Sequence, residues 1–212
     1  MMVKRKRRKQ YDAFGVRNIP IILSIIIIVV GTIVFTISLR GLGQSVLHEK
    51  APVNQVDNSK EEFVQELVPI AKELNQTYGI LPSIILGQAI LESDWGQSEL
   101  SAKYNNLFGI KSFSASDDSV KLTTKEYKDG EWIEIKANFK VYASWNDCMI
   151  DHTLLFVNGV DWDPYLYQGV LLASDYKTAA LALQTAGYAT DPDYANKIIN
   201  VIESYNLNQY DN

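Results

Sequence analysis

Apolar residues are unevenly spread along the chain, and one block of them stands apart. Positions 19–39 are dominated by Ile, Val and Leu, and no charged residue occurs between Arg17 and Arg40. At about 1.5 Å per residue, a helix over this block is roughly 30 Å long, which matches the hydrocarbon thickness of a bilayer. The pattern therefore predicts a transmembrane helix over 19–39.

The flanking residues predict how this helix is oriented. Lys and Arg cluster between Lys4 and Lys9, and such clusters stay on the cytoplasmic side of a membrane. We therefore expect residues 1–18 to be a cytoplasmic basic segment and the remainder to lie outside the cell membrane, in a single-pass arrangement. A cleavable signal peptide is the alternative. Its apolar region is usually about 7–15 residues long and ends in a small-x-small site, whereas this run leads into Ser38-Leu39-Arg40.

Beyond the apolar block, residues 40–58 are polar and aperiodic, which predicts an extracellular tether. Helical spacing then begins. Ser59-Lys60-Glu61-Glu62 has the form of a capping box, and Pro82 suits the first turn of a second helix. The predicted helices run from Ser59 to near Gly79, from Pro82 to about Trp95, from Ser144 to about Val157, from Asp175 to Ala186, and from Pro192 through Ile202.

Two β-rich segments interrupt the helices. Residues 120–127 and 132–142 flank Lys128-Asp129-Gly130-Glu131, in which Asp-Gly is a strong hairpin signal. The sequence therefore predicts an α+β domain over 59–212, mostly helical, with an inserted β-hairpin lobe.

Charge and cysteine content narrow the functional classes. From Gly41 onward the chain carries 12 Lys and no Arg against 24 Asp and Glu. Nucleic-acid binding needs clustered cations, so we expect no nucleic-acid partner. Cys148 is the only cysteine, so the chain cannot form an internal disulfide. We expect Cys148 to be a small buried apolar residue, as free cysteines usually are.

Candidate chemistry lies in the second predicted helix. Gln88 and Glu92 are four residues apart and therefore share a face, apolar residues surround Glu92, and Trp95 follows it. Burial against an aromatic ring raises the pKa of a carboxyl, which suits a general acid. The alternative interpretation is that Glu92 lies on the surface and pairs with a lysine. This pattern alone supports the two interpretations equally.

Several separated motifs follow one another between roughly residues 60 and 206. They are Ala89-Ile90-Leu91-Glu92-Ser93-x-Trp95-Gly96, Ser98-x-Leu100, Asn105-Asn106-Leu107-Phe108-Gly109-Ile110-Lys111, Phe139-x-Val141-Tyr142-x-Ser144-Trp145, Asp151-His152, and Gly187-Tyr188-Ala189-Thr190-Asp191-x-x-Tyr194-Ala195. By these motifs and their order, the chain closely resembles glycoside hydrolase family 73, the peptidoglycan β-N-acetylglucosaminidases that include flagellar rod-cap hydrolases and many Gram-positive autolysins.

The resemblance implies a lysozyme-like fold and a set of roles. Glu92 matches the catalytic acid, Glu126 matches a second carboxylate on a mobile hairpin, and Tyr188 matches a tyrosine that supports the reacting sugar. Residues expected to line or buttress the glycan groove are Gln88, Trp95, Asn106, Phe108 and Tyr194. Asp94 departs from the family, which often has glycine after Glu-Ser.

The expected activity is hydrolysis of the β-1,4 bond between N-acetylglucosamine and N-acetylmuramic acid by an endo-β-N-acetylglucosaminidase. Partners are peptidoglycan glycan strands and, through 19–39, the cell membrane of a Gram-positive bacterium; we expect a monomer. We expect neither a metal nor an organic cofactor, because Asp151 and His152 without a third ligand make a weak metal site. A muramidase, a lytic transglycosylase and a non-catalytic wall-binding module remain alternatives.

Overall fold

A computed structural model describes residues 58–128 and 131–212. The predicted basic segment, the predicted span 19–39 and nearly all of the predicted tether lie outside these ranges. Within them, no helix is both long enough and apolar enough to cross a membrane. The membrane anchor therefore stays a prediction from the sequence.

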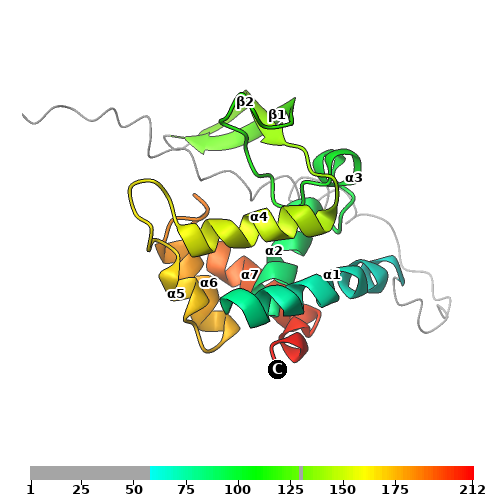
Figure 1. Cartoon of the computed structure of the whole chain (residues 1–212), viewed down its shortest axis with the longest axis vertical. Coiled ribbons are helices and arrows are strands. Elements are labelled where there is room, and N and C mark those ends of the chain that lie inside the picture. Colours follow the sequence, from blue (N-terminus) through cyan, green and yellow to red (C-terminus); the bar gives the residue numbers. More distant parts are fainter. Residues whose placement is uncertain (1–57, 129–130) are drawn as a thin grey trace, which may run out of the picture.

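The described part is mostly helical with one two-stranded sheet (Figure 1), which confirms the predicted α+β class. The five predicted helices are present with small shifts: α1 begins one residue before Ser59, and α7 begins two residues after Pro192. Three short helices were not predicted, because four to six residues are too few to show a period. The helices are α1 (Asn58–Tyr78), α2 (Pro82–Ser93), α3 (Glu99–Tyr104), α4 (Trp145–Asn158), α5 (Gln168–Leu171), α6 (Tyr176–Thr185), α7 (Tyr194–Ser204) and the 3-10 helix η2 (Leu207–Tyr210).

Helix α2 is the centre of the core. Every residue from Pro82 to Ile90 is buried, and the helix packs against α1, α6, α7 and η2. A helix that is apolar all round is stable only when it is enclosed in this way. Gly87 allows α7 to approach, because a Cβ there would lie 3.1 Å from the side chain of Ile202.

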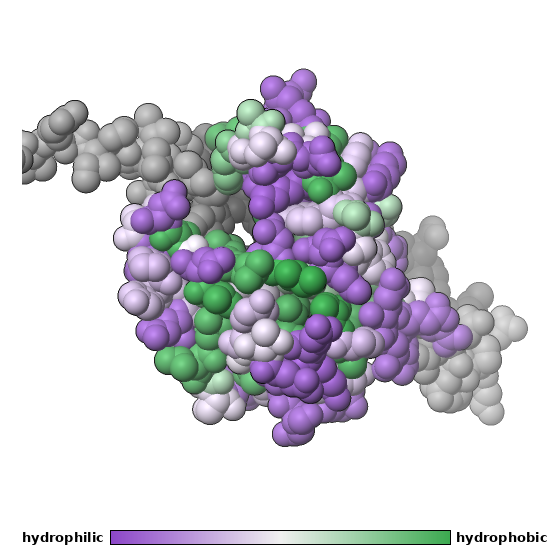
Figure 2. All heavy atoms as spheres, in the orientation of Figure 1, coloured by the Kyte–Doolittle hydropathy of each residue, from purple (hydrophilic) through white to green (hydrophobic). Residues whose placement is uncertain are grey.

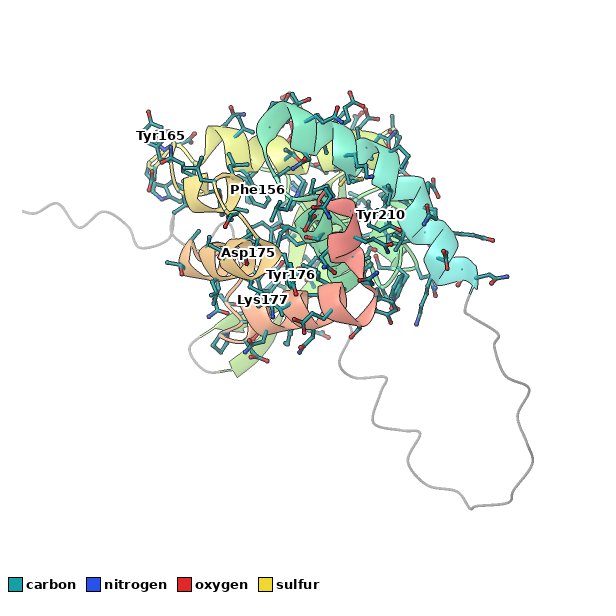
Figure 3. All side chains as sticks on the ribbon, turned by 90° about the horizontal axis from the view of Figure 1, so that it is seen from below. Phe156, Tyr165, Asp175, Tyr176, Lys177 and Tyr210 are labelled. Carbon is teal, nitrogen blue, oxygen red and sulfur yellow. The ribbon has the colours of Figure 1, made fainter. Side chains whose placement is uncertain are left out.

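The C-terminal residues hold the first turn of α2 in place. The Ser83 amide donates to Asp211 Oδ1 at 2.8 Å, and the Ser83 hydroxyl donates to Asp211 Oδ2 at 2.7 Å. Helix N-termini leave amide donors unpaired, and a carboxylate there is favourable. Nearby, Tyr210 lies beside α1 (Figure 3) and accepts a hydrogen bond from Gln65. The chain end is thus built into the core that supports α2.

The hairpin consists of β1 (Ser119–Lys128) and β2 (Glu131–Lys140), paired antiparallel as predicted. It stands apart from the helical body, above α4 in Figure 1. Its base is tied to the preceding loop, because the Lys140 amide donates to the Ile110 carbonyl at 2.9 Å and the Ser112 amide donates to the Asn138 carbonyl at 2.9 Å. These two hydrogen bonds join the base of the hairpin to the loop between α3 and β1.

Candidate active site

Glu92 lies in the last turn of α2, just before an unusual change in backbone direction. Asp94, Trp95 and Gly96 all have left-handed backbone, with φ of 50°, 60° and 74°. Such φ values are uncommon outside glycine, least so for Asp and Asn. Asp94, the position that departs from the family, is therefore a residue type that tolerates this conformation.

Ser93 fixes this turn. Its hydroxyl donates to the Ala89 carbonyl at 2.6 Å and accepts the Gly96 amide at 2.7 Å. Gly96 itself is required by close packing, since a Cβ would lie 2.8 Å from the ring of Phe63 and 2.9 Å from that of Trp145. The Ser-x-Trp-Gly part of the sequence motif is thus a structural device that ends α2 immediately after Glu92.

Trp95 contacts aromatic rings on the side of α1 and α7. Its ring meets Tyr205 edge-on at 4.5 Å and Phe63 at 6.1 Å between centroids, and the Lys60 ammonium lies 5.1 Å from its centroid. Together with Tyr210 it lines a small pocket of about 320 Å³. Through these contacts Trp95 supports the turn that follows α2. Direct contact of Trp95 with substrate stays a prediction.

The Glu92 carboxyl is held by a chain of buried polar groups. Tyr194 Oη donates to Glu92 Oε1 at 2.8 Å, and Gln88 Nε2 donates to Tyr194 Oη at 3.0 Å. Gln88 and Glu92 indeed share one helical face, and Tyr194, the first residue of α7, joins them. Three of the predicted site residues are therefore in direct contact.

The surroundings of Glu92 favour its protonated form. Burial raises the pKa of its carboxyl well above the ordinary value, against the lowering effect of the Tyr194 hydrogen bond and the charge of Lys197. Lys197 makes its own ion pair with Asp191. Glu92 is half-buried and bonds to Tyr194, so the structure favours an acid of raised pKa over a surface carboxylate paired with a lysine.

Tyr188 belongs to the same cluster. Its ring stacks on that of Tyr194, with centroids 5.7 Å apart, and it is 3% exposed. Burial, and after it the negative charge of Glu92, raises the pKa of Tyr188 well above its ordinary value. Tyr188 Oη lies 3.0 Å from His152 Nε2 on α4. The site is therefore assembled from α2, α4, α7 and the turn before α7.

Asn106 and Phe108 are both buried, and they support the loop between α3 and β1. The Asn106 amide donates to the carbonyls of Ile110 and Lys140 at 2.9 Å, and its Oδ1 accepts the Ile110 amide at 2.9 Å. Phe108 stacks on His152 with centroids 3.8 Å apart. These two residues join the hairpin base to α4, and their contact with substrate stays a prediction.

A cavity of about 610 Å³ begins at Tyr188 and extends between the loop before β1, the base of β2 and the C-terminal end of α4. In Figure 2, apolar residues gather in the middle of the face that is drawn. Two exposed rings line the cavity, Phe113 at 66% and Trp162 at 56%. Neither was singled out from the sequence, because single aromatics in loops carry no period; their exposure in one cavity is the informative signal.

Asp151 and His152 face different partners. Asp151 Oδ2 accepts from Lys140 Nζ at 2.9 Å and from Tyr142 Oη at 2.6 Å, whereas His152 faces Tyr188. Among residues 58–128 and 131–212, no cluster of three His, Cys, Asp or Glu residues suited to a metal ion occurs.

Glu126 lies on β1 with Ile133 of β2 as its Cα partner. Its side chain is outside the described part of the structure. The proposed second carboxylate therefore has a place on the hairpin, and its catalytic role stays a prediction.

This geometry can be compared with known proteins. A family model described as mannosyl-glycoprotein endo-beta-N-acetylglucosaminidase matches residues 68–207. The chain belongs to this glucosaminidase family. The exo-glucosaminidase LytG of Bacillus subtilis is 47% identical over 154 residues, which are 73% of this chain and 54% of LytG. A probable N-acetylmuramidase of Lactococcus lactis subsp. cremoris is 36% identical over 86% of this chain and 42% of its own length. The chain thus spans about half the length of these curated relatives.

Solved structures place this glucosaminidase-family domain in the lysozyme-like α+β fold. The catalytic domain of the autolysin Auto from Listeria monocytogenes superposes with a TM-score of 0.65 at 39% identity, covering 77% of this chain and 91% of that domain. A C-terminally truncated glycoside hydrolase domain of FlgJ from Salmonella typhimurium gives a TM-score of 0.55 at 34% identity, covering 69% of this chain and 97% of that domain. The predicted family resemblance is confirmed.

The hydrogen bond from Tyr194 has a measurable effect on Glu92. Tyr194 donates to the carboxylate and stabilises its charged form, so Tyr194→Phe should raise the pKa of Glu92 further. NMR titration of the Glu92 carboxyl carbon measures this directly. Tyr142→Phe is the matched control, since it removes a tyrosine–carboxylate bond at Asp151 and should leave the Glu92 titration unchanged. A lowered or unaltered Glu92 pKa in Tyr194→Phe would contradict the assigned role.

Proposed function

We propose that this chain hydrolyses peptidoglycan at the β-1,4 bond between N-acetylglucosamine and N-acetylmuramic acid, with Glu92 as general acid. The observation that carries the proposal is the half-buried Glu92 carboxyl, whose pKa is raised by burial and whose position is fixed by a hydrogen bond from Tyr194. A carboxyl that stays protonated near neutral pH can donate a proton to a leaving glycosidic oxygen.

The reaction divides into two roles. Glu92 protonates the leaving oxygen while positive charge develops on the sugar ring. In the first route, Glu126 on the hairpin activates a water molecule, which attacks the anomeric carbon. In the second route, the sugar's own acetamido group attacks this carbon before water does. The attachment of the hairpin by its base supports the first route, because such an element can close over a bound substrate.

The cavity beside Tyr188 is the proposed place for glycan. Its volume of about 610 Å³ is in the usual range for small-molecule sites, and it combines aromatic rings with the ion-paired Lys140 and Asp151. Exposed rings such as those of Phe113 and Trp162 present flat apolar faces, which suit the apolar faces of sugar rings.

A muramidase is the second candidate, because one similar protein is an exo-glucosaminidase and another is a probable N-acetylmuramidase. Digestion of purified peptidoglycan, borohydride reduction of the new ends and mass spectrometry separate the outcomes. Reduced glucosamine ends support the proposal. Reduced muramic ends indicate a muramidase, anhydro-muramic ends a lytic transglycosylase, and unchanged glycan a wall-binding module.

We also propose that residues 19–39 anchor the domain to the cell membrane with the basic N-terminal segment inside. The uncharged apolar run and the preceding Lys/Arg cluster support this arrangement. A flexible tether over 40–58 has a typical span of about 23 Å, which would keep the domain near the membrane surface.

Replacing the proposed acid gives the first functional test. Glu92→Gln cannot donate the proton and should lower turnover by about 10²–10⁴-fold, with glycan binding and the melting temperature nearly unchanged. Turnover is measured as the release of new reducing ends from peptidoglycan. Glu99→Gln, an exposed carboxyl on α3, is the matched control and should retain full activity. Activity of Glu92→Gln within threefold of wild type would remove Glu92 from the mechanism.

Glu126 distinguishes the two routes of attack. If it activates water, Glu126→Gln should lower turnover by about 10²-fold, within the range for general base catalysis, and the first product should have inverted anomeric configuration. NMR of the product before mutarotation reports the configuration. Glu134→Gln, an exposed carboxyl on β2, is the control on the same hairpin. Retained configuration, or near-normal turnover of Glu126→Gln, would assign the attack to the acetamido group.

The anchor predicts a cellular location. The full chain should sediment with membranes and resist a high-salt wash, because burial of an apolar span is insensitive to salt. Deletion of residues 19–39 should release the protein. Protease added to cells stripped of wall should digest the domain in the intact chain. Recovery of a soluble form that begins near Gly41 would instead show a cleaved signal peptide.

A further inference from the structure

His152 occupies an enclosed position behind the proposed active site. It is 0% exposed on α4, its ring stacks on Phe108 at 3.8 Å, and the edge of Phe156 meets it at 4.7 Å. Phe156 lies within the helical body in Figure 3. Burial lowers the pKa of His152 to about 3, so the imidazole is neutral near neutral pH. A neutral imidazole has a single N–H, and its position decides what the ring can donate.

The hydrogen bonds of the ring constrain that position. Nε2 lies 3.0 Å from Tyr188 Oη, while Nδ1 has no hydrogen-bond partner within the described part of the chain. If the proton were on Nδ1, a buried N–H would be unpaired, which is rare in folded proteins. With the proton on Nε2, only a lone pair on Nδ1 is unpaired, and the N–H is satisfied by Tyr188.

The Tyr188 hydroxyl can donate one hydrogen bond of its own. Within the described part of the chain, the one hydrogen-bond partner of Tyr188 Oη is His152. If His152 donates to the phenolic oxygen, the proton of the phenol must point elsewhere. Tyr188 also lines the 610 Å³ cavity, where an acceptor could lie.

We propose that His152 is a positioning residue whose Nε2–H donates to Tyr188 Oη, so that the Tyr188 hydroxyl donates its proton into the cavity, to an oxygen of the bound sugar. This inference rests on the proposed function, because it assigns the partner of Tyr188 as a substrate oxygen. A sugar hydroxyl or the carbonyl of an N-acetyl group has the required acceptor chemistry. His152 itself touches no substrate and acts only through Tyr188.

The tautomer can be read from the unaltered protein. The chain has two histidines, His48 and His152, so a full chain labelled with 15N-histidine in detergent micelles gives few signals, and His152→Gln identifies those of His152. We expect two-bond 1H–15N correlations in which Nε2 is protonated and Nδ1 is not. A protonated Nδ1, alone or together with Nε2, would overturn the proposal.

A double-mutant cycle tests whether His152 acts through Tyr188. His152→Phe removes the donor while keeping a flat buried ring, and it should lower kcat about 3- to 10-fold, the usual effect of one hydrogen bond, with KM nearly unchanged. Combined with Tyr188→Phe, it should cause no further loss, since its target hydroxyl is gone. His152→Gln, which can still donate an N–H, should restore most of the activity.

The outcomes separate this inference from the proposed function. A purely structural role predicts the same loss from His152→Phe in both backgrounds and no rescue by His152→Gln, and that result would overturn the positioning role. The tautomer measurement decides the case if His152→Phe does not fold. Failure of the proposed function has a different signature, namely unchanged turnover in Glu92→Gln, and it would leave the His152 tautomer as predicted.

Discussion

The enclosure of α2 is the constraint on which the rest of the structure depends. A helix buried from Pro82 to Ile90 must be surrounded, and the helices packed around it leave little freedom to rotate or slide. Asp211 fixes its first turn, and the Ser93 hydroxyl fixes its last. Glu92 lies in the last turn of this buried helix, so the packing that stabilises the fold also sets the position of the proposed acid and raises its pKa.

Leaving a polar group unpaired near such a core is costly, and most polar groups of the site have partners. Glu92, Tyr194 and Gln88 form one run of hydrogen bonds across α2 and α7. Tyr188 stacks on Tyr194 and forms a separate hydrogen bond with His152 on α4. Each group holds its neighbour in a defined orientation, because an unpaired buried donor is costly. A pre-oriented site of this kind needs no large rearrangement within the helical body when substrate arrives.

The cavity beside Tyr188 is built differently from the surroundings of Glu92. Its walls come from loops and from the hairpin base, which are held by Asn106 and by the ion pair between Lys140 and Asp151. These connections are fewer than those around α2, and they place the exposed rings of Phe113 and Trp162 beside one cavity. A rigid helical body that carries the acid and a lobe that is joined through its base suit a polymer substrate, which must enter, be held and leave.

The sequence by itself determined the five longer helices, the hairpin, the shared face of Gln88 and Glu92, and the family, because each depends on local spacing or on contiguous motifs. Only the tertiary structure decided that Trp95 buttresses the turn and that Tyr194 holds Glu92, since these contacts join residues far apart in the chain. The same holds for the cavity, whose walls come from separate loops without any period. Local pattern specifies which face of an element is buried, whereas long-range packing selects the partner that it meets.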